Sequence, residues 1–192
     1  DGKSVMVLGY GAIGSRVARI CRAFDMRVSV LRRSDGAPAE QGIQVLNEND
    51  WREHLAKTDF LHLCLPHTEE TEGIIGDAEI KRLSAQAVIV NTARGPLIDE
   101  DALFSALSEK RILGAGLDVW WNYPENRLTA FQEYPSKHRF EELDNVVMTP
   151  HRAGDFGDEA LERRRISAVG ELVATLIRDG GHPNQIDPKA GY

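Results

Sequence analysis

Three charged or ionisable side chains follow or end short apolar segments that lie far apart in the chain: Arg94, Asp118 and His151. A guanidinium can hold a carboxylate through two parallel hydrogen bonds and polarise an adjacent carbonyl group. A protonated imidazole can donate a proton while such a carbonyl is reduced. If the fold brings them into one cleft, Arg94 and His151 suit the chemistry of a small 2-oxo or 2-hydroxy acid.

A second group of residues, GYGAIG at 9–14, has the spacing of a dinucleotide-binding turn. It follows an apolar segment and precedes a helical pattern, and this context separates it from an ordinary glycine-rich turn. Gly9 would permit a tight turn, Gly11 would let a pyrophosphate approach the backbone, and Gly14 would allow close packing of helix on strand. The free N–H groups and dipole of the helix would attract the phosphates. The predicted cofactor-binding residues of this turn are Gly9, Gly11, Ala12, Ile13 and Gly14.

The segment SVLRRSDG (29–36) lacks an acidic residue where NAD sites usually have one for the ribose 2′-hydroxyl. Arg32 stands eighteen residues after Gly14, close to the expected position of that Asp or Glu. A carboxylate there repels a 2′-phosphate, whereas a guanidinium binds it. We therefore predict that Arg32, Arg33 and Ser34 bind the 2′-phosphate, which makes NADP the favoured cofactor. The alternative is that these arginines are solvated and NAD binds through other contacts.

Apolar segments alternate with helical patterns, and this alternation predicts how the residues above are positioned. The apolar segments are nearly continuous, as in strands buried on both faces. Their alternation with helices predicts an α/β fold: a Rossmann-type, doubly wound parallel sheet in a three-layer αβα arrangement. Its carboxyl edge would carry Arg94, Asp118 and His151. Predicted strands are 4–9, 27–31, 60–65, 87–92, 114–119 and 145–149, with a short one at 43–46, and predicted helices are 14–24, 51–57, 77–83, 100–110 and 158–178.

The composition argues against several classes of protein. A net charge of −7 disfavours nucleic acid as the main partner, because phosphate binding needs a basic surface. No apolar run approaches the length of a membrane span and no signal-peptide pattern is present, so we expect a cytoplasmic protein. Cys21 and Cys64 lie in apolar patterns typical of buried thiols. His62, Cys64 and His67 do not form a closed ligand set, so no metal is expected.

Taken together, the motifs are specific in content and in order. The chain resembles the D-isomer-specific 2-hydroxyacid dehydrogenases through LGYGAIGSRVA, LPHTEET, VNTARGPLIDEDAL, GAGLDVW and TPHRAG, over nearly all 192 residues. The resemblance implies that Arg94 binds the substrate and that His151 is the acid/base. It also implies that Asp118 binds the nicotinamide carboxamide and that Pro66 and Thr92 line the nicotinamide site. A substrate of the glyoxylate or hydroxypyruvate type and a homodimer are further expectations from the family.

One departure from the family concerns the partner of His151. The family usually has a glutamate five residues after the position of Asp118, hydrogen-bonded to the histidine. Here that position is Tyr123, and Glu125 follows two residues later. In an extended segment Glu125 would lie on the same face, displaced by about 6.6 Å, and could reach His151 as a third catalytic residue. The alternative is that Glu125 faces solvent and the imidazolium lacks this partner.

A second departure concerns domain organisation. Family members carry a separate N-terminal substrate domain, and nothing in this chain corresponds to it. We therefore expect residues 1–180 to form a dinucleotide-binding domain and residues 181–192 to form a tail that would return to the substrate domain. Such a chain should bind NADP or NAD but turn over substrate poorly. The alternative to an oxidoreductase is a dinucleotide-sensing corepressor on the same scaffold, against which the retention of Arg94 and His151 argues.

Overall fold

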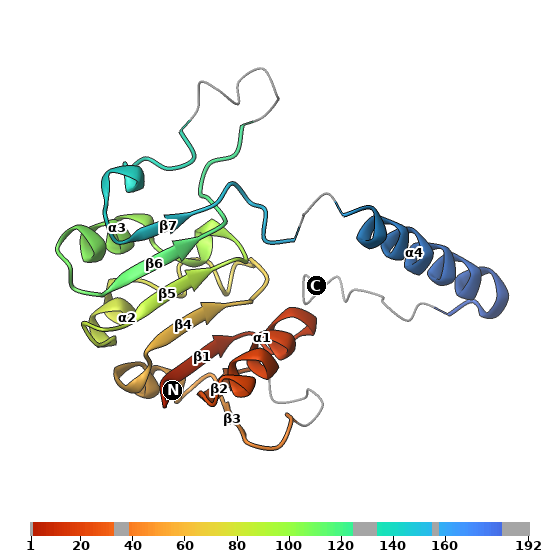
Figure 1. Ribbon diagram of the computed structural model, residues 1–192, viewed down its shortest axis with the longest axis horizontal. Helices are drawn as coiled ribbons and strands as arrows, with labels where there is room; N and C mark the ends of the chain where they lie inside the picture. Colours follow the sequence, from red (N-terminus) through yellow and green to blue (C-terminus); the bar gives the residue numbers. More distant parts are fainter. Residues whose placement is uncertain (1, 33–38, 125–133, 155–157, 182–192) are drawn as a thin grey trace. The chain divides into compact units, whose positions relative to one another are not determined.

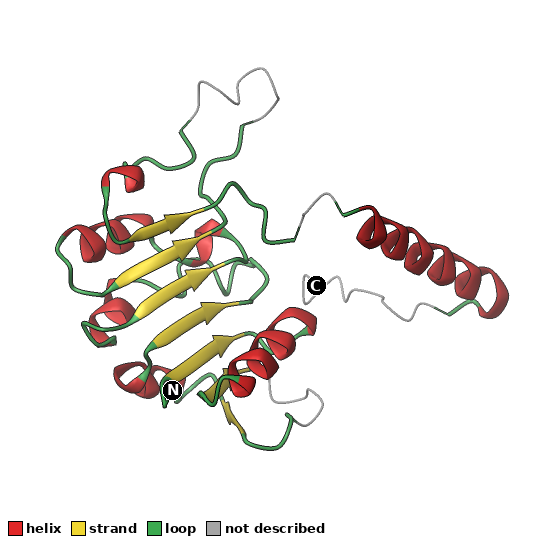
Figure 2. Ribbon diagram, in the orientation of Figure 1, coloured by secondary structure: helices red, strands yellow, loops and turns green. Residues whose placement is uncertain are grey.

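In the part of the chain that the structure describes, seven strands pair side by side in one sheet (Figure 1 and Figure 2). The computed structural model describes residues 2–32, 39–124, 134–154 and 158–181. The order across the sheet is β3-β2-β1-β4-β5-β6-β7, and each neighbouring pair is parallel. The strands are β1 (Ser4–Leu8), β2 (Arg27–Leu31), β3 (Ile43–Leu46), β4 (Phe60–Leu63), β5 (Val88–Asn91), β6 (Gly114–Leu117) and β7 (Val146–Met148).

The chain reverses its direction across the sheet at β1. It first builds outward through β2 and β3, and then returns to place β4 on the other side of β1. Leu8 at the end of β1 pairs with both Leu31 and Leu63, so the carboxyl ends of these three strands are level. Open α/β sheets bind their ligands in the crevice at such a reversal. The predicted Rossmann-type sheet is confirmed, and every predicted strand overlaps an observed one.

Both faces of the sheet are apolar, which explains why the strand sequences alternate so little between apolar and polar residues. On one face, valines of β1 and β2 pack with Ala18 of α1. On the other face, Met6 of β1 belongs to a larger core with Trp51, Ile80 and Leu103. The sheet therefore lies between two helical layers, as predicted. The helices involved are α1 (Ala12–Ala23) on the first face and α2 (Asp77–Arg82), α3 (Glu100–Ser108) and the 3-10 helix η1 (Trp51–Lys57) on the second.

Hydrogen bonds from residues at the starts of α3 and α2 explain where these helices begin. Asp99 caps α3, because its carboxylate accepts the backbone N–H of Ala102 at 2.8 Å. At the start of α2 the Gly76 N–H donates to the Glu79 carboxylate at 3.1 Å. Residues 51–57, predicted as helical, form a 3-10 helix, which is common in short connecting pieces. Two further 3-10 turns, η2 (Gly95–Leu97) and η3 (Phe140–Glu142), lie in connections after β5 and before β7.

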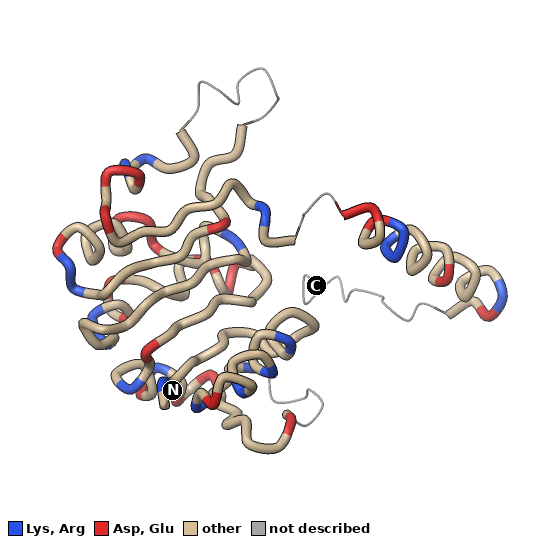
Figure 3. Tube along the Cα trace, viewed as in Figure 1, with Lys and Arg blue, Asp and Glu red and all other residues tan. Residues whose placement is uncertain are grey.

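The chain divides into two compact units, residues 1–151 and residues 152–192. The described part of the second unit contains α4 (Glu159–Asp179), which Asp158 caps by accepting the Ala160 N–H at 2.8 Å and which ends at Gly180 in a left-handed conformation, with φ 62°. None of the residues of α4 is buried. Figure 3 shows Lys and Arg interspersed with Asp and Glu along both units. In the described part of the chain, no helix is long and apolar enough to cross a membrane.

Candidate dinucleotide and substrate site

The glycine turn after β1 lies at the sheet reversal. The Gly9 N–H donates to the Leu31 carbonyl at 3.0 Å, which joins the turn to the end of β2. Gly9 has φ +100°, a conformation that glycine adopts without strain. Any side chain there would also place its Cβ 2.7 Å from the Cys64 carbonyl oxygen after β4. Gly9 is therefore required both for the turn and for the close approach of two backbone segments.

Gly11 and Gly14 have different surroundings. A Cβ on Gly14 would lie 1.9 Å from the Gly9 carbonyl oxygen, so α1 can start this close to the turn only because residue 14 is glycine. A Cβ on Gly11 would meet nothing within 4 Å. Gly11 thus borders open space at the helix start, as a backbone position approached by a pyrophosphate must.

The start of α1 is arranged to attract an anion. Its first turn, which includes Ala12 and Ile13, contains no acidic residue, and its N-cap residue, Gly11, has no side chain to cap it. The Ile13 side chain is exposed. The first N–H groups of a helix have no partner inside the helix, and the dipole gives this end a partial positive charge. These features and the open space at Gly11 fit the phosphates of a dinucleotide.

Arg32 lies at the end of β2, directly after the residue that binds Gly9. Its side chain is partly buried, and its Nε atom is buried with no hydrogen-bond partner among the described residues. A buried guanidinium donor without a partner is costly, and a phosphate oxygen would satisfy it. Arg32 therefore fits a 2′-phosphate. Arg33 and Ser34, the other predicted contacts, lie outside the described residues.

Pro66 and Thr92 follow β4 and β5, the strands next along the sheet. Pro66 is fixed by a small turn, in which the Thr71 hydroxyl donates to the Pro66 carbonyl at 2.7 Å. The Thr92 hydroxyl lies 3.1 Å from Nε2 of His62. Burial lowers the pKa of His62 below its usual range, which favours the neutral ring in this contact. Sequence reasoning considered His62 only as a metal ligand and missed its contact with Thr92.

Arg94 is presented by an Asx-type turn at the end of β5. The fully buried Asn91 accepts the Ala93 N–H at 3.1 Å and donates to the Arg94 carbonyl at 2.8 Å. The Arg94 side chain is exposed, and its Nη1 donates to the Ala93 carbonyl at 2.6 Å. Gly95 follows because a Cβ there would lie 2.2 Å from the Trp120 carbonyl oxygen. This close approach joins the Arg94 turn to the segment that follows Asp118.

Asp118 and His151 stand on the same edge, after β6 and β7. Asn91, Leu117 and Met148 end neighbouring strands in register, so the segments carrying Arg94, Asp118 and His151 leave the sheet at one level. Asp118 is buried, and the Thr149 hydroxyl donates to its carboxylate.

His151 has an unusual backbone and a contact that the sequence did not predict. Its φ is +56°, in the left-handed region that histidine enters more readily than most residues. Its Nδ1 lies 3.0 Å from the hydroxyl of Tyr123. Tyr123 is the residue that replaces the expected glutamate, and sequence reasoning treated it only as a departure. Glu125, the alternative partner, lies outside the described residues and stays a prediction.

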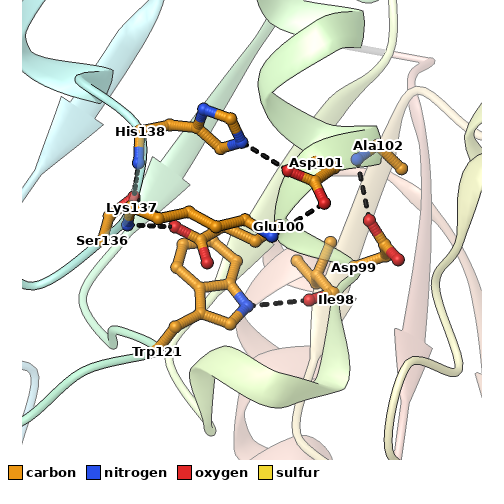
Figure 4. Close-up of polar contacts among 9 residues, drawn as sticks. All are labelled: Ile98, Asp99, Glu100, Asp101, Ala102, Trp121, Ser136, Lys137 and His138. Carbon is orange, nitrogen blue, oxygen red and sulfur yellow. Dashed lines mark hydrogen bonds and ion pairs between the residues drawn. The ribbon is translucent and has the colours of Figure 1, made fainter.

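The connection after β6 is anchored on α3 (Figure 4). The Trp121 indole N–H donates to the Ile98 carbonyl at 2.9 Å. Farther along, Lys137 and His138 both reach the Asp101 carboxylate, at 2.7 and 2.6 Å. Hydrogen bonds from Lys137 and then His138 lower the pKa of Asp101. Within the described ranges, His, Cys, Asp and Glu side chains form no group of three that could hold a metal ion.

Comparisons with known proteins agree with this geometry. Residues 1–153 match the family described as D-isomer specific 2-hydroxyacid dehydrogenase, NAD binding domain. A glyoxylate reductase of Pyrococcus furiosus is 36% identical over 173 residues, which cover 90% of this chain and 46% of that protein. The NADPH-dependent glyoxylate/hydroxypyruvate reductase of Sinorhizobium meliloti, solved with NADP and sulfate, is similar with a TM-score of 0.78 and 26% identity, over 99% of this chain and 57% of that chain.

A D-isomer specific 2-hydroxyacid dehydrogenase of Xanthobacter autotrophicus, solved with NADPH and MES, has a TM-score of 0.82 and 28% identity, over 99% of this chain and 73% of that chain. The chain spans about half the length of the curated relatives it matches. Because the similar proteins are named as reductases and dehydrogenases, the corepressor alternative is not favoured.

Proposed function

Because the chain belongs to the D-isomer specific 2-hydroxyacid dehydrogenase family, we propose that it is the coenzyme-binding part of an oxidoreductase that acts on a small 2-oxo or 2-hydroxy acid. The observation that carries the proposal is the level exit of Arg94, Asp118 and His151 from β5, β6 and β7, on the sheet edge that also carries the glycine turn. A glyoxylate or hydroxypyruvate type of substrate is supported by the names of the similar reductases.

Each of these residues has a distinct role in the proposed reaction, for which the bound nicotinamide cofactor supplies the hydride. Arg94 binds the substrate carboxylate and polarises the adjacent carbonyl. His151 donates a proton to the carbonyl oxygen as the carbonyl carbon is reduced, and accepts it back in the oxidation. Asp118, oriented by Thr149, accepts a hydrogen bond from the nicotinamide carboxamide. Pro66 and Thr92 line the pocket beside it.

NADP is the proposed cofactor, and NAD is the alternative. The support is the buried Arg32 Nε, which has no hydrogen-bond partner among the described residues, together with the NADP or NADPH held by similar enzymes. Arg33 and Ser34 belong to the same proposed contact with the 2′-phosphate. Glycines 9, 11 and 14, with Ala12 and Ile13, would hold the pyrophosphate.

The cofactor part of the proposal is tested by titrating the chain with NADP and NAD in a calorimeter, before and after Arg32→Asp. A charge-assisted hydrogen bond contributes about 1.5–3 kcal/mol, so we expect NADP to bind roughly 10- to 100-fold more weakly after the substitution. NAD should bind as tightly as before or more tightly, because a carboxylate there can accept a hydrogen bond from the ribose 2′-hydroxyl. Arg27→Asp is the matched control, because Arg27 stands at the opposite end of the same strand. Equal NADP and NAD affinities in the parent, unchanged by Arg32→Asp, would refute the 2′-phosphate contact.

The catalytic part is tested in the longest natural polypeptide that contains this sequence, by following NADPH oxidation with glyoxylate and with hydroxypyruvate. Arg94→Gln and His151→Gln should each abolish most of the turnover and leave NADP affinity unchanged. If neither substitution lowers the rate, the assigned roles are wrong.

We further propose that residues 1–180 act as the coenzyme domain and that residues 181–192 lead back to a substrate domain. We also propose that the protein is a cytoplasmic homodimer. Sedimentation of the longest natural polypeptide that contains this sequence tests the dimer.

A further inference from the structure

The hydroxyl of Tyr123 and the imidazole of His151 are joined by a hydrogen bond between residues 28 positions apart in the chain. Their Oη and Nδ1 atoms lie 3.0 Å apart. The ring centroids are 5.6 Å apart with a tilt of 53°, so the rings are not stacked and the polar contact defines the pair. The hydroxyl is held from a second side, since the backbone N–H of Trp120 donates to it at 3.2 Å.

The segment that carries Tyr123 is fixed at two further points. The Trp120 indole N–H donates to the Thr149 carbonyl at 3.1 Å, two residues before His151. The Trp121 indole N–H donates to the Ile98 carbonyl before α3, as Figure 4 shows. Trp120 is buried, at 8% exposure, and its backbone N–H donates to the phenol oxygen. The hydroxyl therefore reaches His151 from a segment that these hydrogen bonds anchor.

The backbone of His151 adds an independent observation. Its φ of +56° is sparsely populated for a residue with a Cβ, and such conformations persist where the surrounding structure holds them. In this conformation, Nδ1 of the side chain lies within hydrogen-bond distance of the Tyr123 hydroxyl. Backbone and hydrogen bond together select one orientation of the ring.

A phenol hydroxyl has one donor and two acceptor sites. The Trp120 N–H occupies one acceptor site, which leaves one donor and one acceptor. The hydroxyl can thus donate to a bare Nδ1 or accept from a protonated Nδ1–H. A carboxylate in this place can only accept, and it adds a negative charge beside the ring. Tyr123 can therefore orient the imidazole in both of its protonation states without adding charge.

We propose that Tyr123 is the positioning residue of His151: its hydroxyl holds Nδ1, and Nε2 is left as the nitrogen that exchanges a proton with the substrate oxygen. The assignment rests on the proposed function for the meaning of that proton transfer. In the reducing direction the Nε2–H bond breaks, its proton passes to the carbonyl oxygen, and the ring becomes neutral with Nδ1–H donated to the phenol oxygen. Tyr123 itself does not touch the substrate in this scheme.

The first test reads the ring without any catalysis. The chain is labelled with ¹⁵N-histidine, and the Nδ1 and Nε2 signals of His151 are recorded by NMR in the parent and in Tyr123→Phe. Removing the hydroxyl should shift both signals, because Nδ1, whose N–H donates to the phenol oxygen in the proposed neutral state, loses its partner. Tyr134→Phe is the matched control, since Tyr134 is an exposed tyrosine on the same connection. Identical His151 signals in all three proteins overturn the proposal.

The second test uses turnover in the longer natural polypeptide. Loss of one hydrogen bond, at about 1 kcal/mol, corresponds to about a five-fold change, so Tyr123→Phe should lower kcat by about five-fold with KM nearly unchanged. Tyr123→Glu should restore the rate. It should also move the alkaline limb of the pH profile up by about half a pH unit, because a carboxylate stabilises the imidazolium.

Glu125→Gln separates the two candidate partners of His151. If Glu125→Gln lowers kcat and Tyr123→Phe does not, Glu125 is the partner and the proposal is refuted. If the parent reduces no 2-oxo acid at all, the proposed function fails, and the NMR comparison still decides whether Tyr123 sets the state of the ring.

Discussion

Asp59 joins the amino ends of β1 and β4 through hydrogen bonds. Its ionisation should contribute measurably to the free energy of unfolding. The Asp59 carboxylate accepts the Ser4 N–H and the Ser4 hydroxyl, both at 2.8 Å, and the Lys3 ammonium at 2.9 Å. These contacts, the Ser4 backbone N–H first, lower the pKa of Asp59 to about 2. The side chain is 22% exposed, so solvent screens it only in part.

The magnitude follows from linkage. The ordinary pKa is 3.8, so the difference of about 1.8 units corresponds to about 2.4 kcal/mol at pH 7, at about 1.36 kcal/mol per unit. Partial exposure reduces this to about 2 kcal/mol. Because the folded-state pKa is depressed, this stabilisation is fully present above pH 3.8 and is lost as the pH falls toward 2. By pH 3 it should be smaller by about 1 kcal/mol.

The assay is urea unfolding of the parent and of Asp59→Asn at pH 7 and at pH 3, followed by tryptophan fluorescence. Asparagine keeps an oxygen for the Ser4 N–H but removes the charge, so the variant should be less stable by about 2 kcal/mol at pH 7 and by about half of that at pH 3. Asp144→Asn is the control, because Asp144 is 78% exposed and forms an exposed ion pair with Lys110. A stability difference that is the same at both pH values refutes the assigned charge effect.

Two other predictions concern the crevice at the opposite, carboxyl ends of β1 and β4. Gly14→Ala should destabilise the fold by about 3 kcal/mol or more in urea unfolding, because its Cβ would lie 1.9 Å from the Gly9 oxygen. Gly11→Ala should change the stability by at most about 1 kcal/mol and weaken dinucleotide binding about ten-fold or more. Equal losses of stability in the two variants would contradict the assigned roles. Burial raises the pKa of Cys64 to about 11, so in Cys21→Ser the remaining thiol should react with a thiol reagent at pH 8 about 100-fold more slowly when folded than when unfolded, and equal rates would count against it.

The fold could be predicted because its signals are local. Each buried strand is a short apolar run, and the glycine turn occupies six consecutive residues, so neither needs knowledge of distant contacts. For the same reason, the spacing of Arg32 from the glycine turn predicts that Arg32 lies at the end of β2. Parallel pairing then follows from the alternation of strands and helices, and it brings Arg94, Asp118 and His151 to one edge without any contact between them being known.

The contact between Tyr123 and His151 could not be predicted in this way, because it depends on where an irregular segment runs. Register in a sheet is set by the strand pattern, but the path after β6 is set by a few side-chain anchors, the indole groups of Trp120 and Trp121 among them. The resemblance placed a carboxylate at this position, and so directed attention to Glu125. An aromatic hydroxyl at residue 123 was the available signal, since it can serve an imidazole as either donor or acceptor.

Arg32 and His151 differ in where their hydrogen-bond partners come from. For Arg32, the strand end fixes the place of the backbone, and the buried Nε then calls for an acceptor that the described residues do not provide. For His151, the chain itself supplies the partner of Nδ1, which is the Tyr123 hydroxyl. The Trp120 N–H in turn donates to that hydroxyl. A ligand is therefore expected to change the surroundings of Arg32 more than those of His151. Chemical shifts of the two side chains on titration with NADP would measure that difference, and a larger change at His151 than at Arg32 would contradict it.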